Sequence, residues 1–397
     1  MKHPTVISQE EPLKQHRGVF FKQLSLWQGV ALLVSATVGA GVLGIPYAVA
    51  KVGVIVGIAY IVGLGLLVIG LHLLLGEIAI RTKSPLQLVG FAHTYIGKKA
   101  GWLMSAIFYI SLFGAQLIYL IGEGESLQAL FGGSAWQWSL VFFFISSVVI
   151  FLGMRTIKTV ELVLTIGLLL VVTLIGIFSV PHIQFPHITT IHLGQLLFPY
   201  GVILFAFHAA SAIPEVHTLL RDQQKTFKKT IIIAGILSIC LYSIFALTVV
   251  GVTGEETTQI ATIGLGNTLG PLMRICGNIF AALAMGTSYL LIALSLRDSL
   301  RWDKNIPTLP ATAIVVGIPL IIFLLGLREF IGVMDIVGGV FISLESVLIV
   351  WIYMNAKKRG DITPEQGFIR HVWPLLIIIL AAFSFGGLYS VINTFFL

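Results

Sequence analysis

The amino-acid sequence predicts an all-α integral membrane protein with eleven transmembrane helices. Of its 397 residues, 57% are apolar and 10% are charged, whereas a soluble globular domain has about 25% charged residues. Because a spanning helix needs about 20 mostly apolar residues, roughly eleven helices would use almost all of the apolar fraction. This composition excludes a soluble enzyme, a disordered chain, a secreted disulfide scaffold and a nucleic-acid binder.

Charge-free runs and loop signals place the helices in order along the chain. A stretch from 161 to 215 is too long for one span, and the segment 181–187 with two prolines divides it into a fifth and a sixth helix. The tenth helix contains Asp335 and Glu345, and the eleventh runs from Arg370 to near Leu397. The other predicted spans lie between residues 22 and 51, 51 and 77, 99 and 123, 125 and 155, 229 and 255, 274 and 297, and 304 and 328. A glycine-rich piece, 260–272, is interpreted as a loop or re-entrant element.

The distribution of basic residues predicts the orientation. Residues 1–22 are polar, hold no signal-peptide core and are interpreted as a cytoplasmic N-terminal tail. With this end inside, all 24 lysines and arginines except Lys51, Arg274 and Arg328 fall on the cytoplasmic side, as the positive-inside rule requires. We therefore expect a multi-pass protein of the inner or plasma membrane, surrounded by the lipid bilayer, with its C-terminus outside.

The first helix contains a block that a regular helix does not favour. Between Ser35 and Tyr47 it holds Gly39, Gly41, Gly44 and Pro46, and both residue types are costly in helix interiors. In lipid the freed backbone groups need partners, so such a block predicts a discontinuous helix whose amides and carbonyls line a site. Close helix packing through small residues is the alternative interpretation.

The sixth helix carries a related block. Phe205 to Glu215 ends in Ser-Ala-Ile-Pro-Glu, and aligning Pro214 with Pro46 matches small residues before Ile-Pro in both helices. The two blocks are 168 positions and five helices apart, and an odd number of helices per repeat inverts the second repeat. Paired broken helices in inverted repeats predict a substrate site near the bilayer midplane. The expected organisation is a first repeat at 23–180, a second at 195–355 and a separate helix at 371–397.

Four segments resemble a known family. Thr37 to Gly53, reading TVGAGVLGIPYAVAKVG, closely resembles the first helix of the amino acid/auxin permease family, which includes the bacterial hydroxy/aromatic amino acid permeases. Segments 114–123, 205–215 and 287–298 are similar to the third, sixth and eighth helices of that family. The resemblance implies the five-plus-five inverted-repeat, leucine-transporter-like fold of the amino acid–polyamine–organocation superfamily, with one further helix. It also implies ion-coupled amino acid uptake.

The candidate site residues follow from the two blocks and the resemblance. Amides at the start of a half-helix attract a carboxylate, and carbonyls at the adjoining helix end suit an ammonium group. The predicted substrate-binding residues are Thr37, Gly39, Ala40, Gly41, Gln116, Phe205, Phe207, His208 and Ser211. The resemblance places a coupling cation near the carbonyls of Ser35 and Val38 and the hydroxyls of Thr287 and Ser288. Ordinary packing of the phenylalanines, and ordinary helix-to-helix hydrogen bonding of the hydroxyls, remain alternatives.

Ionisable groups inside spans are functional candidates by default. Glu215 is predicted to be a protonatable gate or a partner of a nearby base, and Glu345 to be a proton carrier or part of a structural pair. Glu77 and Arg81 are expected to form a salt bridge at the cytoplasmic end, and His72 to be a core histidine. The two cysteines show no disulfide or metal-ligand spacing.

These observations predict a secondary active transporter, a symporter of neutral or aromatic amino acids coupled to H⁺ or Na⁺. No catalytic cofactor is expected. A membrane sensor that binds an amino acid without net transport is the alternative. An enzyme is disfavoured, because the sequence holds no nucleophile elbow, zinc motif or P-loop. The sequence leaves the oligomeric state open.

Overall fold

The computed structural model describes residues 25–84, 86–152, 167, 170–220, 223–304, 306–361, 368 and 372–396. These residues form helices and connecting loops, and none of them lies in a strand. The predicted tail at 1–22 and the predicted cytoplasmic residues Arg155, Lys158, Arg221 and Arg370 lie outside the described part of the chain.

The first half of the described chain contains helices of very different lengths. They are α2 (Leu26–Thr37), α3 (Ala40–Val52), α4 (Val54–Ile80), α5 (Leu88–Ile96), α6 (Lys98–Phe131), α7 (Ala135–Leu152), an apolar helix at Leu170–His182 that ends in η1 (Val180–His182), α9 (Phe185–Thr189) and η2 (Leu193–Gln195).

The second half begins with another interrupted helix. Its elements are α10 (Pro199–Phe207), α11 (Ala212–Leu219), α12 (Gln224–Thr253), η3 (Gly254–Glu256), α13 (Ala261–Leu269), α14 (Pro271–Asp303), α15 (Thr308–Leu324), α16 (Phe330–Asp335), the π-helix η4 (Ile336–Ile342), α17 (Ser343–Arg359) and α18 (Trp373–Phe395).

Nine spans in the described chain are long and apolar enough to cross a membrane, counting the bent pair α2 and α3 as one. Two shorter apolar helices, Leu170–His182 and α15, lie where the fifth and ninth spans are predicted. Helix α13 has nine residues, which is too short to span a bilayer, since about 20 are needed. The glycine-rich piece is therefore a short helix between spans, in agreement with its interpretation as a non-spanning element.

Several helices extend beyond the charged residues at which the sequence analysis ended them. Helix α6 continues past Glu123 to Phe131, and α4 continues past Glu77. Arg274 lies inside α14. The reason is that a helix satisfies its own backbone hydrogen bonds in an apolar medium, so it continues wherever the charged side chain finds a partner. Glu77 has such a partner in Arg81, one turn further on.

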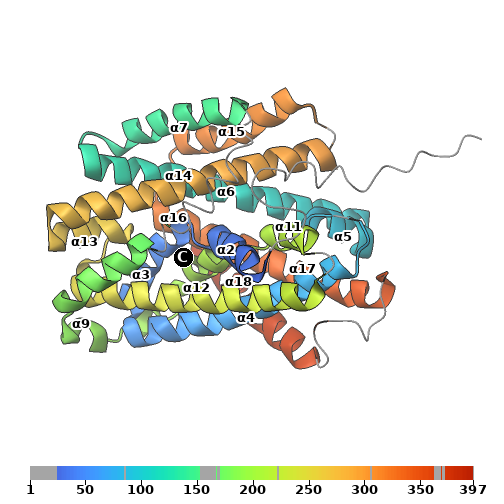
Figure 1. The fold of residues 1–397 in the computed structure, drawn as a ribbon, viewed down its shortest axis with the longest axis horizontal. Coiled ribbons are helices and arrows are strands. Elements are labelled where there is room, and N and C mark those ends of the chain that lie inside the picture. The colour runs from blue at the N-terminus through green and yellow to red at the C-terminus, as the bar shows by residue number, and fades with distance from the viewer. Residues whose placement is uncertain are drawn as a thin grey trace, which may run out of the picture.

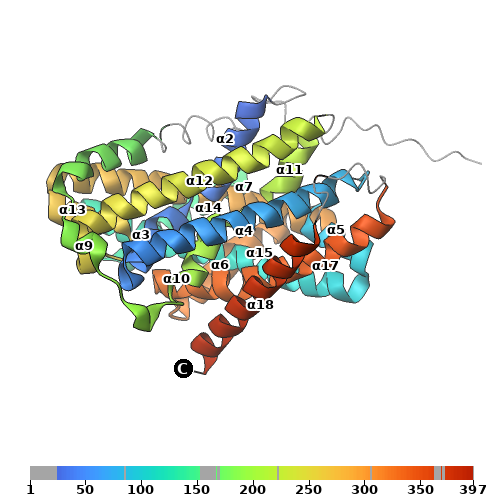
Figure 2. The same cartoon turned by 90° about the horizontal axis from the view of Figure 1, so that it is seen from below.

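The helices run side by side along the long axis of the molecule (Figure 1). Helices α6 and α14 pack along one another, and α7 and α15 lie outside them. On the other side α4 packs against α12, and α18 crosses α17 (Figure 2). The broken helices α3 and α10 contact each other in the interior. Helices α9 and α13 mark one end of the bundle, and α5 marks the other.

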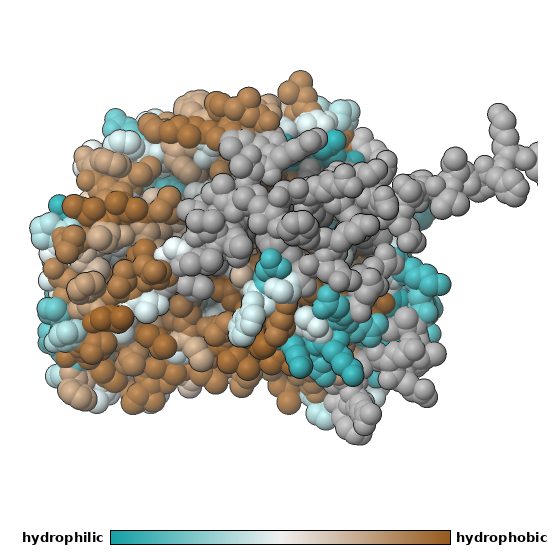
Figure 3. Space-filling view, in the orientation of Figure 1, coloured by the Kyte–Doolittle hydropathy of each residue, from teal (hydrophilic) through white to brown (hydrophobic). Residues whose placement is uncertain are grey.

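Large apolar side chains cover much of the surface. In Figure 3 they make up much of the coloured surface, and polar side chains gather toward the ends of the helices. Exposed apolar patches of this size mark a surface that contacts other apolar material. The spans and this surface together indicate a multi-pass membrane protein. Strongly exposed examples are Leu66, Phe144, Leu152, Phe178, Leu272, Ile377 and Phe385.

Candidate functional site

The first spanning helix is broken at Val38 and Gly39. Helix α2 ends at Thr37, α3 begins at Ala40, and the two segments are bent by 59°. Val38 (φ −85, ψ 88) and Gly39 (φ −126, ψ −140) both leave the helical region. The discontinuity predicted between Ser35 and Tyr47 is therefore confirmed.

The proline of this block does not mark the break. Pro46 lies inside α3, seven positions beyond Gly39. Its missing amide hydrogen removes one hydrogen bond from the helix interior, but the chain leaves the helical path at Val38 and Gly39. A Cβ on Gly39 would lie 2.7 Å from the hydroxyl of Tyr119, so the close approach of this hydroxyl favours a glycine at the break.

The span formed by α10 and α11 is broken at His208–Ser211. Helix α10 ends at Phe207 and α11 begins at Ala212. The two broken helices meet directly, because a Cβ on Gly41 would lie 2.6 Å from Cβ of Ala206 and nearer still to its Cα. Both interruptions therefore flank the same small region of the interior.

Tyr242 on α12 connects the two breaks. Its hydroxyl lies 2.9 Å from the carbonyl oxygen of Thr37 and 2.8 Å from that of Ala206. A phenol carries one proton, so it donates to one of these carbonyls at a time. The Tyr242 ring also packs edge to face on Phe207, with centroids 4.9 Å apart. Sequence reasoning missed this residue, because one tyrosine in an apolar helix gives no periodic signal.

The start of α3 faces polar groups from α6 and α14. The hydroxyl of Tyr119 forms hydrogen bonds with the side chain of Ser288 and with the backbone of Ala40. The Ser288 oxygen lies 3.2 Å from the position that a Cβ on Gly39 would take. Two hydroxyls therefore converge on the first break.

Gln116 lies on the same helix as Tyr119 and is fully buried. Neither polar atom of its side-chain amide has a hydrogen-bond partner in the described structure. Leaving such a group buried costs about 1–3 kcal/mol per group. A buried amide without partners is a group that a polar ligand could satisfy.

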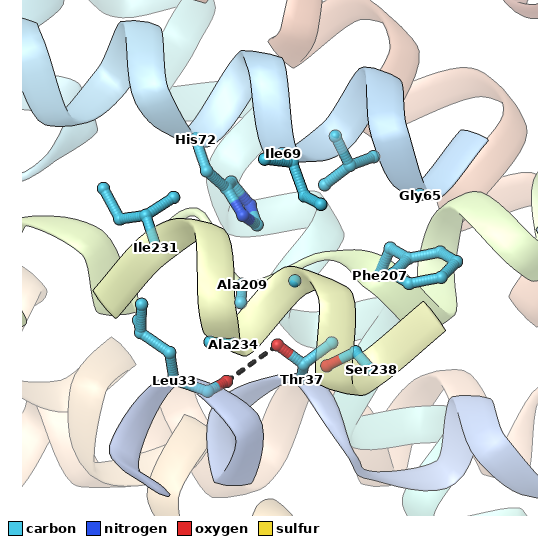
Figure 4. A pocket seen from close by; sticks show the side chains of 12 residues that line it. Leu33, Thr37, Gly65, Ile69, His72, Phe207, Ala209, Ile231, Ala234 and Ser238 are labelled. Atoms are coloured by element: carbon cyan, nitrogen blue, oxygen red, sulfur yellow. Dashed lines mark hydrogen bonds between the residues drawn. The ribbon is translucent and has the colours of Figure 1, made fainter. Parts of the chain in front are cut away.

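A small cavity opens on the other side of the breaks. Its volume is ≈20 Å³, enough for about one water molecule. Figure 4 shows Thr37, Phe207, Ala209 and His72 around it, with the Thr37 hydroxyl donating to the Leu33 carbonyl at 2.7 Å. In this conformation the cavity does not hold an amino acid.

His208 and Glu345 meet in the core. Nε2 of His208 lies 3.7 Å from Oε1 of Glu345, and the two side chains are 14% and 1% exposed. Neither this nitrogen nor either carboxyl oxygen has a hydrogen-bond partner in the described structure. The two residues, predicted separately as a substrate contact and a proton carrier, therefore form one pair.

The structure brings together some of the other predicted residues and not all. Thr287 donates its hydroxyl to the Leu283 carbonyl at 2.8 Å, within its own helix. Phe205 is buried beside η4, where a Cβ on Gly338 would lie 2.9 Å from its amide nitrogen. Ser211 is half-buried at the start of α11.

Ser35 remains a predicted cation ligand, and Glu215 remains a predicted gate. Both residues take part in interactions within the structure. Ser35 is half-buried in the last turns of α2, and Glu215 is half-buried in the first turn of α11. Neither position is tested by these contacts.

The ion pair predicted at Glu77 and Arg81 is present, and it is deeply buried. Arg81 Nη2 and Glu77 Oε1 are 2.7 Å apart, with side-chain exposures of 0% and 1%. The Tyr353 hydroxyl and the Phe368 amide donate to the two oxygens of the same carboxylate. The pair therefore joins α4 to α17 and to the segment beyond it.

A larger cleft lies at the end of the bundle that holds α13. Its volume is ≈690 Å³, and Glu125, Arg328 and Glu329 contribute to its lining together with Gln259 and Thr258. A further carboxyl, that of Glu123, is 2% exposed where α6 packs against Gly286 on α14. Sequence reasoning missed Glu123 and Glu125, because it treated charged residues as helix ends.

Two broken helices that cross inside an apolar bundle define a multi-pass membrane transport protein. The family described as "Transmembrane amino acid transporter protein" has a model that matches residues 22–393, and the chain belongs to this family. This confirms the resemblance to the amino acid permeases. Relatives of this kind are transporters, so the chain is not an enzyme.

Individual relatives agree with this assignment. The chain is 24% identical over 350 residues to "Glutamine transporter 2" of Aliivibrio fischeri, covering 83% of this chain and 89% of the relative. It is also 24% identical over 378 residues to "Tyrosine-specific transport system 1" of Haemophilus influenzae, covering 89% and 94%.

Solved structures share the fold. A crystal structure of MhsT in complex with L-phenylalanine superimposes with a TM-score of 0.70 at 15% identity, covering 94% of this chain and 99% of that chain. A manganese transporter of Eremococcus coleocola gives 0.68 at 14% identity, covering 100% and 90%.

Proposed function

We propose that this chain is a secondary active transporter that moves neutral or aromatic amino acids across the cell membrane, coupled to H⁺ or Na⁺. Membership of the amino acid transporter family supports the substrate class. Two relatives are named for glutamine and for tyrosine, and both of these amino acids have neutral side chains. A crossing pair of broken helices is the feature of this molecule that best supports transport.

The contact between Gly41 and Ala206 carries the proposal, because it brings two helix interruptions to one place. The amides at the start of α3 form the positive end of a helix dipole, which favours the substrate carboxylate. The ends of α2 and α10 are negative ends, which favour its ammonium group. Gln116 would then satisfy its orphaned amide by contact with the substrate.

The aromatic residues near the breaks suit an apolar or aromatic substrate side chain. Phe205 and Phe207 are buried on the last turns of α10, and His208 follows them. Aromatic contacts of this kind favour another ring. Because the cavity beside Phe207 holds about one water molecule, binding requires the side chains around the breaks to move apart.

The proposed architecture has eleven spans in two inverted repeats of five, followed by α18. The cytoplasmic N-terminus and outside C-terminus follow from the positive-inside rule. Transport would proceed by one repeat rocking against the other around the fixed site. One charge moving through 100 mV supplies about 2.3 kcal/mol, which is enough for useful accumulation.

A cation site would use the carbonyls of Ser35 and Val38 and the hydroxyls of Thr287 and Ser288. Ser288 is near the first break, which supports its part in such a site. Thr287 would have to release the Leu283 carbonyl to reach the ion. Proton coupling would leave the hydrogen bond between Thr287 and Leu283 in place. The two possible coupling ions therefore make different demands on this helix.

Uptake into proteoliposomes tests the proposal. Purified protein is reconstituted, and labelled glutamine, tyrosine and phenylalanine are supplied under imposed pH and Na⁺ gradients separately. Saturable, gradient-driven accumulation of at least one of them is expected. Saturable binding without uptake or exchange would refute transport and indicate a sensor.

A further inference from the structure

The pair formed by Glu345 and His208 is an unsatisfied titratable site in the protein core. Glu345 lies in the first turn of α17 and His208 at the first position after α10. Their facing atoms are 3.7 Å apart, which is longer than a hydrogen bond of 2.7–3.2 Å. Both carboxyl oxygens and the imidazole Nε2 are buried without a hydrogen-bond partner in the described structure.

Glu77 in the same protein shows how a permanently ionised buried carboxylate is held. Its Oε1 accepts from Nε and Nη2 of Arg81 at 3.0 and 2.7 Å and from the Tyr353 hydroxyl at 3.2 Å. Its Oε2 accepts from the Phe368 amide at 3.0 Å. A buried charge needs pairing and hydrogen bonds of this kind. Glu345 has no hydrogen bonds of this kind in the described structure and faces only the His208 imidazole at 3.7 Å, so its surroundings suit a carboxyl group that gains and loses a proton.

The pair lies where two unusual helices touch. Residues 336–342, directly before α17, form the π-helix η4, which packs against α10 and α18. A π-helical turn often marks a functional position. A Cβ on Gly338 of η4 would overlap the carbonyl of Gly201, so the two backbones lie very close together. A change at Glu345 or His208 therefore acts directly on the broken sixth helix.

Other titratable groups surround this region. His72 on α4 is a second buried histidine, and the Tyr200 hydroxyl lies 2.7 Å from the Ser343 hydroxyl at the start of α17. The remaining titratable side chains on the elements packed against α10, η4 and α17 include Tyr60, Glu77, Arg81, Tyr95, Tyr109, Tyr119, Glu123, Asp335, Tyr353 and Tyr389. Within the described residues, His208 is the basic group within salt-bridge distance of Glu345.

We propose that Glu345 and His208 together form the binding site of the coupled proton, so that H⁺ and not Na⁺ drives transport. This inference rests on the proposed function of amino acid transport. The proton binds to the Glu345 carboxylate as an O–H bond and removes its charge before the bundle changes conformation. When the two side chains close to hydrogen-bond distance, the O–H bond breaks as an N–H bond forms on His208. The resulting carboxylate and imidazolium return the proton by the reverse step.

The coupling follows from the cost of a buried charge. With the proton bound, Glu345 is neutral and its unpaired oxygens suit the apolar interior. Without the proton, the carboxylate has to attract a donor, and His208, which begins the non-helical segment between α10 and α11, lies within 3.7 Å of it. Proton binding and the geometry of the proposed substrate site thus both depend on Glu345 and His208.

The test compares the parent protein with Glu345→Gln and, as a matched control, Glu256→Gln. Glu256 is exposed in η3, away from the pair. Proteoliposomes are loaded with a pH-sensitive dye and supplied with labelled glutamine, tyrosine or phenylalanine. Acidification of the vesicle interior during uptake, without Na⁺, is expected for the parent and for Glu256→Gln. In Glu345→Gln, accumulation driven by a pH gradient should fall to the level of protein-free vesicles, while exchange of internal for external amino acid continues.

Each outcome decides the matter. Parent uptake that needs a Na⁺ gradient and produces no acidification would overturn the proposal, and so would parent-like, pH-driven accumulation by Glu345→Gln. If Glu345→Gln does not fold, the acidification measured with the parent and a loss of pH-driven accumulation in His208→Gln with retained amino acid exchange decide instead. Failure of the proposed function is distinguishable, because the folded parent would then neither bind nor exchange any of the three amino acids.

Discussion

Adding one methyl group at Gly41 should disable the substrate site while leaving the protein folded. In Gly41→Ala the new Cβ would lie 2.6 Å from Cβ of Ala206 and closer still to its Cα. Carbon atoms in favourable contact are about 3.5–4.0 Å apart. Helices α3 and α10 therefore have to separate by about 1 Å at the point where both are broken.

The magnitude follows from this displacement. Overpacking in a well-filled interior costs about 1–3 kcal/mol. A displacement of about 1 Å in a positioned site can lower its efficiency by roughly 100-fold. We expect the dissociation constant for the amino acid to rise about tenfold or more, since each tenfold change corresponds to about 1.4 kcal/mol.

The assay is equilibrium binding of labelled glutamine, tyrosine or phenylalanine to purified protein, with size-exclusion chromatography to verify folding. Gly63→Ala is the matched control, because a Cβ there meets no atom within 4 Å. Ala206→Gly in the Gly41→Ala background should restore binding in part, since it removes the clash between the two methyl groups but leaves the new methyl group pressed against the backbone of α10. Parent-like affinity in Gly41→Ala would refute the role of this crossing.

Three further substitutions test other interactions. Gln116→Leu should raise the melting temperature of the substrate-free protein, because it removes a buried amide with two unpartnered atoms that costs about 1–3 kcal/mol per group, and it should weaken substrate binding in the same equilibrium assay. Tyr242→Phe should lower the melting temperature, by about 1–3 kcal/mol of stability, because two buried carbonyls lose their hydroxyl donor. Glu77→Gln should destabilise the protein by about 3–5 kcal/mol, because it leaves the Arg81 guanidinium buried without its counter-charge. Thermal unfolding measures all three changes in stability.

Each of these predictions has a control and a contrary result. A lower melting temperature in Gln116→Leu would mean that the amide has a partner. Tyr60→Phe, on α4, is the control for Tyr242→Phe, and equal effects of the two would remove the special role of Tyr242. Glu255→Gln, at an exposed position, is the control for Glu77→Gln; an unchanged melting temperature in Glu77→Gln would show that the ion pair adds no stability.

The sequence alone predicts the broken helices and places them well. Glycine and proline in an apolar run conflict with a regular helix, so the block after Ser35 favours an interruption over close helix packing through small residues. The exact position is a different matter. Pro46 is tolerated within α3, and Val38 and Gly39 carry the break, because the Tyr119 hydroxyl from a distant helix approaches at this point.

Contacts between helices that are distant in the sequence could not be predicted from the sequence alone. Glu345 stands out as a charged residue in a span, but its approach to His208 depends on the packing of η4 against α10. Tyr242 gives no signal in its own helix, and its role becomes clear from the two carbonyls that it joins. Glu123 was missed for a related reason. A carboxylate in an apolar run is a good marker of a helix end, unless the neighbouring helix buries it, as α14 does here.

The wide turns of η4 also set the rotational phase of everything that follows. Each residue advances an α-helix by about 100°, so the extra residue that a π-turn accommodates rotates the rest of the span by about that angle. Removing one residue between 336 and 342 would therefore direct Glu345 and Tyr353 to other faces of α17 at once. The contact of Glu345 with His208 and the hydrogen bond of Tyr353 to Glu77 therefore depend on the same helical register. A single-residue deletion in η4 would disrupt both contacts, although the span would remain hydrophobic and unbroken.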